Sequence, residues 1–478
     1  MGLLTALLIN LVYGRSLKFD EEIFFNFILP PIIFAAGYNL RKKDFFENFG
    51  YIMFFGLVGT ICTFALVSSG ISLILLIIPI NLPPQEILLF SCILSATDTV
   101  AALSLVKESR YPKLNSILFG EGIMNDAVSI LIFRTIKNYF LKEEVEFGVG
   151  MVFLISLDFF YLLFMSVMVG VGFGLVITFL LKTCYSFKKY PVKETSLMIL
   201  TAYLSYQTSE IFKLSGIISL FVCGIVMAHY TFHNLSDESQ KGTVLAFDTV
   251  GYLAEALVFA YLGLTVFWID TKEFNVTFIL AVTLVLFVAR LVSVFLLPLI
   301  FRILRRPFTL NSKELKIIWY SGLIRGAIAF ALSFHIDTPN KNLIVATTIS
   351  IVLITTFILS TLLQSFAVYI GLAPDRESEL MFEQVRKFVI DPMQTAEISG
   401  YRQIGGEEHV EAKEKEEKTK EDNEKMGFFQ KKWMSFDERV MKPFFIKRTV
   451  KDAENMMGLL DQKGGLTEMI DTKPKEGE

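Results

Sequence analysis

The sequence predicts an all-α polytopic membrane protein followed by a cytosolic tail. Of its 478 residues 53% are hydrophobic, 46 are phenylalanine and only 19% are charged, which is the composition of a membrane protein. Apolar runs of about 20 residues recur without strict alternation, which indicates membrane-crossing helices rather than strands. Because the charged residues concentrate near the C-terminus, we assign 1–371 to a transmembrane domain and 372–478 to the tail.

The apolar runs predict about twelve helices. The first, over 1–13, is shorter than the ~20 residues of a full span and reads as the second half of a helix. The other expected segments are 23–40, 51–80, 86–106, 114–139, 151–181, 195–212, 214–231, 245–268, 275–301, 315–336 and 342–371. Pro30 and Pro31 must disturb the helix expected over 23–40, because proline donates no backbone hydrogen bond.

Basic residues in the connections set the orientation. With this order of segments, four basic connections fall on the side that also carries the tail: 41–43, 107–113, 182–193 and 302–313. The connections on the opposite side, 81–86 and 141–147, are poor in lysine and arginine. Because positive connections stay in the cytosol, we expect the tail to be cytosolic.

Two segments are poor continuous helices. Segment 86–106 contains Thr97 and Asp98 at membrane depth, and segment 315–336 contains Arg325 between glycines. Asp and Thr favour local backbone bonding, and Gly loosens a helix. Secondary transporters built on inverted repeats carry two such broken helices around their site. We therefore expect two crossed broken helices, with Thr97 and Asp98 supplying oxygen ligands for a cation; the alternative is that Asp98 only caps a half-helix.

The stretch FGEGIMNDAVSILIFR, residues 119–134, places Asp126 inside an apolar helix. An acid at membrane depth costs about 2.5 kcal/mol or more and commonly serves an ion path or proton relay. One carboxylate can hold either a proton or a hard cation such as Na⁺, and competition for that group couples the two ions in exchange. The alternative is an Asp126 that bonds to neighbouring backbone or pairs with a basic residue.

Two neighbours of Asp126 are polar as well. Asn125 either orients Asp126 and contributes a ligand, or forms interhelical hydrogen bonds. Glu121 lies four residues earlier and so shares a face of the helix with Asn125. A second buried acid needs a counter-charge, and we expect Arg325 to supply it in a structural ion pair.

Other polar residues in the membrane segments are further candidates. Glu255 and Arg290 either line an access path or pair with each other. His229 and His233 have the i, i+4 spacing of metal ligands, but no third ligand lies near them in the sequence. We expect no cofactor and no metal beyond the transported cation. The cysteines have no paired spacing and are expected to be buried thiols: Cys62, Cys92, Cys184 and Cys223.

The tail divides into three parts. Residues 377–390 have the apolar spacing of a short amphipathic helix, and 405–425 have the charged composition of a disordered segment. Residues 427–449 are aromatic and basic. This last part either lies on a membrane surface, or docks on the transmembrane domain, or is simply solvated.

Several ordered motifs between about residues 20 and 371 resemble one family. They are FFNFILPPI, SATDTVAAL, FGEGIMNDAVS, GIVMAHYTFHNLS and SGLIRGAIAFAL. Together they resemble eukaryotic sodium(potassium)/proton exchangers of the monovalent cation/proton antiporter superfamily. The tail stretch WMSFDERVMKPFF resembles a motif of the organellar branch, and Ile324 before Arg325 is more similar to plant or protist members.

The resemblance implies a homodimer of thirteen-helix protomers, each with a dimerisation domain and a mobile core domain that works as an elevator. It implies that Asp126 carries the ion, with Asp98 and Thr97 near it. It also implies that Asn125 marks electroneutral exchange and that Glu121–Arg325 braces the core. Relative to the family pattern, the first helix is absent and the second appears as residues 1–13.

The expected function is therefore not enzymatic. It is electroneutral exchange of Na⁺ or K⁺ for H⁺ across an endosomal, Golgi or vacuolar membrane rather than the plasma membrane. The expected partners are these ions, the lipid bilayer, a second copy of the chain, and a regulatory protein or larger assembly at the tail, but no nucleic acid. The alternative, motivated by the short start, is a non-transporting subunit or scaffold with an exchanger fold. A cation channel is disfavoured, since the sequence shows neither a ring of acids nor a filter-like loop.

Overall fold

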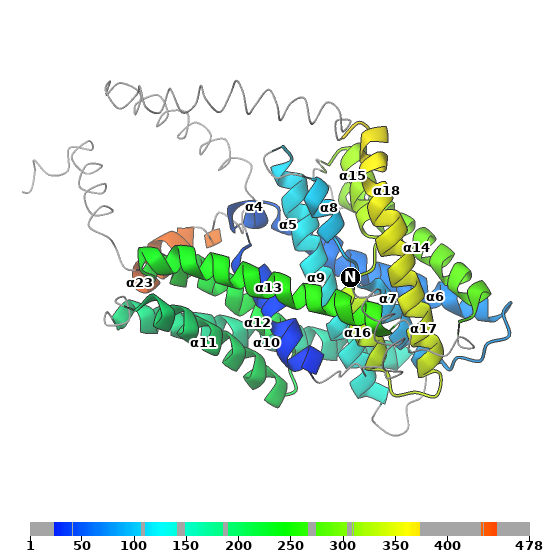
Figure 1. Cartoon of the computed structure of the whole chain (residues 1–478), viewed down its shortest axis with the longest axis horizontal. Coiled ribbons are helices and arrows are strands. Elements are labelled where there is room, and N and C mark those ends of the chain that lie inside the picture. The colour runs from blue at the N-terminus through cyan, green and yellow to red at the C-terminus, as the bar shows by residue number, and fades with distance from the viewer. Residues whose placement is uncertain are drawn as a thin grey trace, which may run out of the picture.

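A computed structural model shows an almost entirely helical chain (Figure 1). It describes residues 23–40, 42–106, 110–140, 149–184, 190–265, 274–303, 308, 310–372, 432–433 and 435–446. The expected partial helix over 1–13 and the tail segments 377–390 and 405–425 lie outside these residues.

Eight helical segments in the described part of the chain are long and apolar enough to cross a bilayer. They are Phe49–Leu75, Pro84–Leu105, Pro112–Phe140, Phe153–Thr183, Gly216–Asn234, Asp237–Gly263, Val276–Leu296 and Lys341–Tyr369. A shorter apolar helix covers Phe24–Tyr38. These segments confirm the prediction of a polytopic all-α membrane protein.

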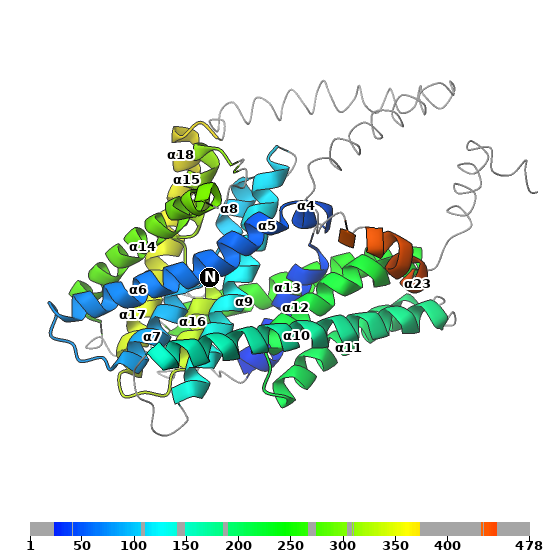
Figure 2. The same ribbon diagram turned by 180° about the vertical axis from the view of Figure 1, so that it is seen from behind.

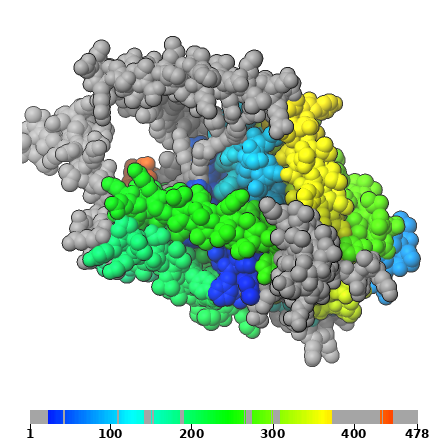
Figure 3. Space-filling model, viewed as in Figure 1, coloured from blue at the N-terminus to red at the C-terminus, as the bar shows by residue number. Residues whose placement is uncertain are grey.

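The helices form two groups. The first, which we name the flanking bundle, brings together α3 (Leu29–Tyr38), α10 (Val149–Thr183), α11 (Pro191–Ile211), α12 (Gly216–Val226) and α13 (Asp237–Thr265). Figure 2 shows α10, α11, α12 and α13 running roughly side by side, and in the space-filling view α13 lies across the face of this bundle (Figure 3).

The second group, the core bundle, contains the two broken helices. Its continuous helices are α5 (Phe49–Met53), α6 (Gly59–Leu75), α9 (Pro112–Phe140), α14 (Val276–Ile303), α17 (Lys341–Ile354) and α18 (Ser360–Tyr369). Its broken helices are α7 (Pro84–Ser95) with α8 (Val100–Leu105), and α15 (Ser312–Ser321) with α16 (Ala327–Phe334). The short helix α4 (Lys42–Glu47) lies between α3 of one bundle and α5 of the other, so it connects the two bundles along the chain.

Pro30 and Pro31 open the first turn of α3, where a missing backbone donor is tolerated. The disturbance expected from them appears as a widened π-helical turn, η1 (Phe24–Ile28), directly before α3. Near the other end of α3, Gly37 lets α12 approach closely: a Cβ there would lie 2.6 Å from the carbonyl oxygen of Phe221. The flanking bundle therefore depends on a small residue at this crossing.

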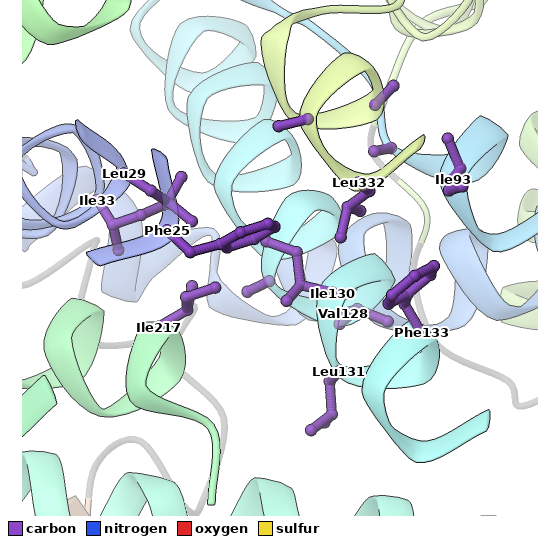
Figure 4. Packing of buried hydrophobic residues seen from close by; sticks show 14 of the residues in the cluster. Phe25, Leu29, Ile33, Ile93, Val128, Ile130, Leu131, Phe133, Ile217 and Leu332 are labelled. Atoms are coloured by element: carbon purple, nitrogen blue, oxygen red, sulfur yellow. The ribbon is translucent and has the colours of Figure 1, made fainter. Parts of the chain in front are cut away.

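Apolar side chains from both bundles meet around α9. Ile130 and Phe133 of α9 are buried, as are Leu29 of α3, Ile217 of α12 and Leu332 of α16 (Figure 4). Because α9 contacts both α7 and α10, it forms the boundary between the bundles.

Candidate ion-binding site

The two broken helices cross at their breaks and are hydrogen-bonded to each other. The backbone N–H of Asp98 donates to the carbonyl of Ile324 at 2.9 Å. Within the first break, Asp98 Oδ1 accepts the N–H of Val100 at 3.0 Å, as expected of an Asp that interrupts a helix. The sequence prediction of two interrupted helices is confirmed, and the breaks face each other.

Backbone groups freed by the second break find side-chain partners on the next helix. The N–H of Arg325 donates to Thr355 Oγ1 at 3.1 Å, and Thr356 Oγ1 donates to the carbonyl of Arg325 at 3.0 Å. In a bilayer every such group must be satisfied within the protein. Gly326 lets the breaks approach, because a Cβ there would lie 2.7 Å from both Cβ and Oδ2 of Asp98.

A cavity of about 320 Å³ opens beside this crossing. Thr97, Asp98 and Asp126 line it from the core bundle, and Glu255 of α13 lines it from the flanking bundle. Asp126 is half-buried, and within the described part of the chain its carboxylate accepts no hydrogen bond. The carboxylate of Asp126 is therefore available to a ligand from the cavity.

Asn125 connects α9 to the first broken helix. Its Nδ2 donates to Thr97 Oγ1 at 2.7 Å, and its Oδ1 accepts from Ser129 Oγ at 3.3 Å. The side chain is only 1% exposed. Both ends of the amide are thus hydrogen-bonded. Asn125 holds Thr97 next to Asp126, which follows Asn125 in the chain.

Glu121 pairs with Arg290 of α14, so the expected ion pair with Arg325 is wrong. The side chains of Arg290 and Glu121 are 1% and 0% exposed. Gly322 creates the space for this pair, because a Cβ at that position would overlap the guanidinium of Arg290. Arg290 is therefore a buried structural residue, and neither its expected place on an access path nor its alternative pairing with Glu255 is correct.

Arg325 is held by the break in which it lies. Its Nη1 donates to the carbonyl of Gly322 at 2.6 Å, and the side chain is fully buried. Its charge and that of Asp126 act on each other, although no hydrogen bond joins them. Arg325 thus provides positive charge near Asp126 instead of bracing Glu121.

Glu255, which was expected on an access path or in a pair with Arg290, lines the cavity. The structure adds two residues that the sequence analysis did not single out: Asn39 at the end of α3 and Asp248 of α13. Asn39 Nδ2 donates to Asp248 Oδ1 at 2.5 Å. Asp248 could have been identified from the sequence as a charge near the start of an apolar segment. Nothing around Asn39 in the sequence distinguishes Asn39 from other polar residues.

His229 and His233, which have the spacing of metal ligands, have other surroundings in the structure. Among the residues that the structure describes, no group of three metal-ligating side chains occurs. His229 Nε2 instead lies 3.0 Å from Asp437 Oδ2 of the tail. All four cysteines are free thiols; Cys92 and Cys223 are buried as expected, but Cys62 and Cys184 are half-buried.

Comparison with known proteins agrees with this architecture. Residues 1–368 match the family model described as "Sodium/hydrogen exchanger, transmembrane". The chain is 35% identical over 388 residues to sodium/hydrogen exchanger 3 of Arabidopsis thaliana, covering 76% of each protein. It is 36% identical over 375 residues to human sodium/hydrogen exchanger 8, covering 75% of this chain and 63% of the relative.

The fold is also similar to that of a solved structure, the sodium proton antiporter MjNhaP1 from Methanocaldococcus jannaschii. The TM-score is 0.59 at 21% sequence identity, over 78% of this chain and 91% of that one. The described helices, the crossed breaks and the matched family model lead to one conclusion: the chain is a multi-pass membrane protein that belongs to the sodium/hydrogen exchanger family.

Proposed function

We propose that the chain exchanges Na⁺ or K⁺ for H⁺, one for one, and that Asp126 binds either the cation or the proton. The observation that carries this proposal is the position of Asp126. Its carboxylate accepts no hydrogen bond from the described residues and faces a cavity at the crossing of two broken helices. Asp98 and Thr97 line the same cavity and supply further oxygens for a cation.

The exchange is electroneutral in this proposal because one carboxylate carries the charge of either ion. Asn125 adds an amide but no second charge, and both ends of that amide are engaged by Thr97 and Ser129. The buried pair Glu121–Arg290 is internally neutral and lies outside the cavity lining. In this proposal Asn125, Glu121 and Arg290 position Asp126 and do not carry ions.

The core bundle moves across the bilayer as an elevator in this proposal. The cavity supports it, since α9 and the broken helices line one side and α3 and α13 line the other. The flanking bundle then stays fixed and pairs with that of a second copy. Glu255 and Asp248 lie on the flanking side, where they would meet ions entering the cavity.

The membrane in this proposal is that of an internal organelle, with the tail in the cytosol. The basic connections and the aromatic, basic tail motif support both statements. The tail segment also packs against the end of α10 that carries Lys182, one of the basic residues used to set the orientation. The same tail would offer a site for a regulatory protein.

Flux measurements in proteoliposomes test the proposal. The wild-type chain should dissipate a pH gradient when Na⁺ or K⁺ is added, with Li⁺ as a third cation for comparison. Asp126→Asn should abolish this flux, whereas Asp158→Asn, which removes an exposed acid of α10 outside the cavity lining, should leave it unchanged. Flux that persists in Asp126→Asn would refute the assignment of Asp126. A wild-type chain without flux that co-purifies with a larger assembly would favour the scaffold alternative.

A further inference from the structure

A segment of the tail docks on the flanking bundle through a buried acid. The segment, described over 432–433 and 435–446, contains η11 (Asp437–Met441) and α23 (Lys442–Phe445) and lies at one end of α10 and α12 (Figure 2). The side chain of Asp437 is 7% exposed. It accepts a hydrogen bond from the hydroxyl of Tyr230, lies 3.0 Å from His229 Nε2, and lies 3.6 Å from Lys442 Nζ.

The end of the same segment is held by two further side chains. Lys182 Nζ donates to the carbonyls of Pro443 at 3.2 Å and Phe444 at 2.5 Å. Asn234 Nδ2 donates to the carbonyl of Phe445 at 2.8 Å. Carbonyls in the last turn of a helix lack intrahelical partners, so these donors satisfy groups that would otherwise need water. Contacts at Asp437 and at the last turn together fix how the segment is rotated about its axis.

That rotation leaves a second, apolar face uncovered by the described residues. Four large apolar side chains follow one another at intervals of three, four and four residues, which places them on one face of a helix. We name them the tail stripe: Trp433, Phe436, Val440 and Phe444, with exposed fractions of 54%, 46%, 50% and 59%. Arg439 and Glu438 are exposed as well, so the segment has charged residues outside the stripe.

The tail stripe continues an exposed apolar surface of α10. The ring of Phe444 stacks on that of Phe179, with centroids 6.4 Å apart and an angle of 17° between the planes. Phe179 is 51% exposed, and Val176, one turn earlier, is 63% exposed. Both lie in the apolar segment Phe153–Thr183 that is long enough to cross the bilayer. The stripe is therefore adjacent to an exposed apolar surface of a helix that is long enough to cross the bilayer.

We propose that the tail stripe inserts into the lipid leaflet at this end of α10, while Asp437 fastens the segment to the flanking bundle. An amphipathic helix at a membrane interface buries its apolar face between the headgroups and the acyl chains. Tryptophan is enriched at that depth, which suits Trp433. The segment is then an interfacial anchor held by lipid on one face and by protein on another. This inference rests on the fold and does not depend on ion transport.

Fluorescence of Trp433 tests the anchor in the full chain. The signal of Trp433 is the difference between the wild type and Trp433→Phe, both reconstituted into nanodiscs of phosphatidylcholine with or without bromine on the acyl chains. Insertion predicts that brominated lipid removes more than half of the difference signal and that aqueous iodide quenches it little. Trp433→Phe keeps an aromatic side chain, so the comparison does not depend on a disruptive change.

Two other outcomes would overturn the proposal. Quenching by iodide and not by brominated lipid would place the stripe in water. Protection from both quenchers would show that protein covers it, either a second copy of the chain or a partner. As an internal check, replacing Phe436 and Val440 by serine should reduce the quenching of Trp433 by brominated lipid at least twofold. Glu438→Gln, a change outside the stripe, should leave the quenching unchanged, and equal effects of the two changes would contradict insertion by the stripe.

Discussion

Asn125 and Thr97 are joined by a hydrogen bond of 2.7 Å that ties α9 to the first broken helix. One partner directly precedes Asp126, and the other directly precedes Asp98. The two carboxylates that line the cavity from the core bundle, Asp126 and Asp98, therefore have neighbours that are joined by a single contact. We expect the geometry of the ion site to depend on this contact more than on any other side-chain hydrogen bond near it.

Substitutions at Thr97 test this dependence. Thr97→Val keeps the shape of the side chain but cannot accept the hydrogen bond of Asn125, so the buried amide loses a partner at a cost of about 1–3 kcal/mol. We expect Thr97→Val to lower exchange in proteoliposomes at least tenfold. Thr97→Ser keeps the hydroxyl and should retain most of the activity. Equal rates for the two variants would contradict the role of this hydrogen bond.

Gly326→Ala should prevent the two breaks from meeting. The added Cβ would lie 2.7 Å from two atoms of Asp98, which is closer than Cβ atoms approach in proteins. We expect loss of exchange and a lower midpoint of thermal unfolding in detergent. Gly172→Ala is the matched control, because nothing lies within 4 Å of a Cβ at that position. A Gly326→Ala protein with normal exchange would show that the breaks are farther apart than described.

The buried pair Glu121–Arg290 should be more important for stability than the partly exposed pair Arg134–Glu210. Removing one member of a buried pair leaves an uncompensated charge and costs about 3–5 kcal/mol, whereas exposed pairs contribute about 0–1 kcal/mol. The side chains of Arg134 and Glu210 are 26% and 28% exposed. Thermal unfolding should therefore shift strongly for Arg290→Gln and weakly for Arg134→Gln.

A double substitution separates pairing from general damage to the core bundle. Replacing Glu121 by Leu and Arg290 by Met together removes both charges while filling similar volume, so it should recover stability lost in Arg290→Gln. If the double variant is less stable than Arg290→Gln, the two side chains do not act as a pair. Arg325→Gln should not be rescued by Glu121→Leu, since Arg325 donates to Gly322 and not to Glu121.

Docking of the tail segment should withstand mild acid. Burial alone raises the pKa of Asp437, but hydrogen bonds from Tyr230 and His229 and the charges of His229 and Lys442 outweigh burial and lower it. An acid with a lowered pKa stabilises docking at pH values above its free pKa of about 3.9 and loses this effect as pH falls through the docked pKa. The contribution of Asp437 should thus be constant between about pH 5 and 8.

Hydrogen–deuterium exchange of residues 437–446, corrected for the intrinsic rate at each pH, measures this docking. We expect constant protection over that range in the wild type and reduced protection at every pH in Asp437→Asn. Glu438→Gln, which changes the adjacent exposed acid, is the control and should behave as the wild type. A loss of protection as pH rises from 6 to 8 would assign control of docking to another group, such as His229, whose protonated form pairs with Asp437.

Most of the fold could be predicted from the sequence because a bilayer imposes simple rules. Apolar runs must be about as long as the membrane is thick, and backbone groups inside it must be satisfied. Asp98 is a polar residue inside an apolar run, and the glycines near Arg325 loosen another. Both broken helices could therefore be identified from the sequence. Asp126 was identified in the same way, as a costly acid in an apolar helix.

The partner of Glu121 could not be predicted, because the choice depends on how distant helices pack. Arg290 and Arg325 both lie deep in apolar segments, and nothing in their local sequence ranks them. The deciding feature is the space beside Gly322, which admits the guanidinium of Arg290. Asn39 was missed for a related reason: its place beside Asp248 arises only when α3 and α13 come together.

The central claim is that one carboxylate, Asp126, holds either a cation or a proton. Calorimetric titration of the purified chain with Na⁺, and separately with K⁺, in buffers of different ionisation enthalpy counts the protons released per cation bound. At a pH low enough that Asp126 holds a proton before the cation is added, we expect one proton released per cation in the wild type, and neither cation binding nor proton release in Asp126→Asn. Cation binding without proton release in the wild type, or unchanged release in Asp126→Asn, would contradict it.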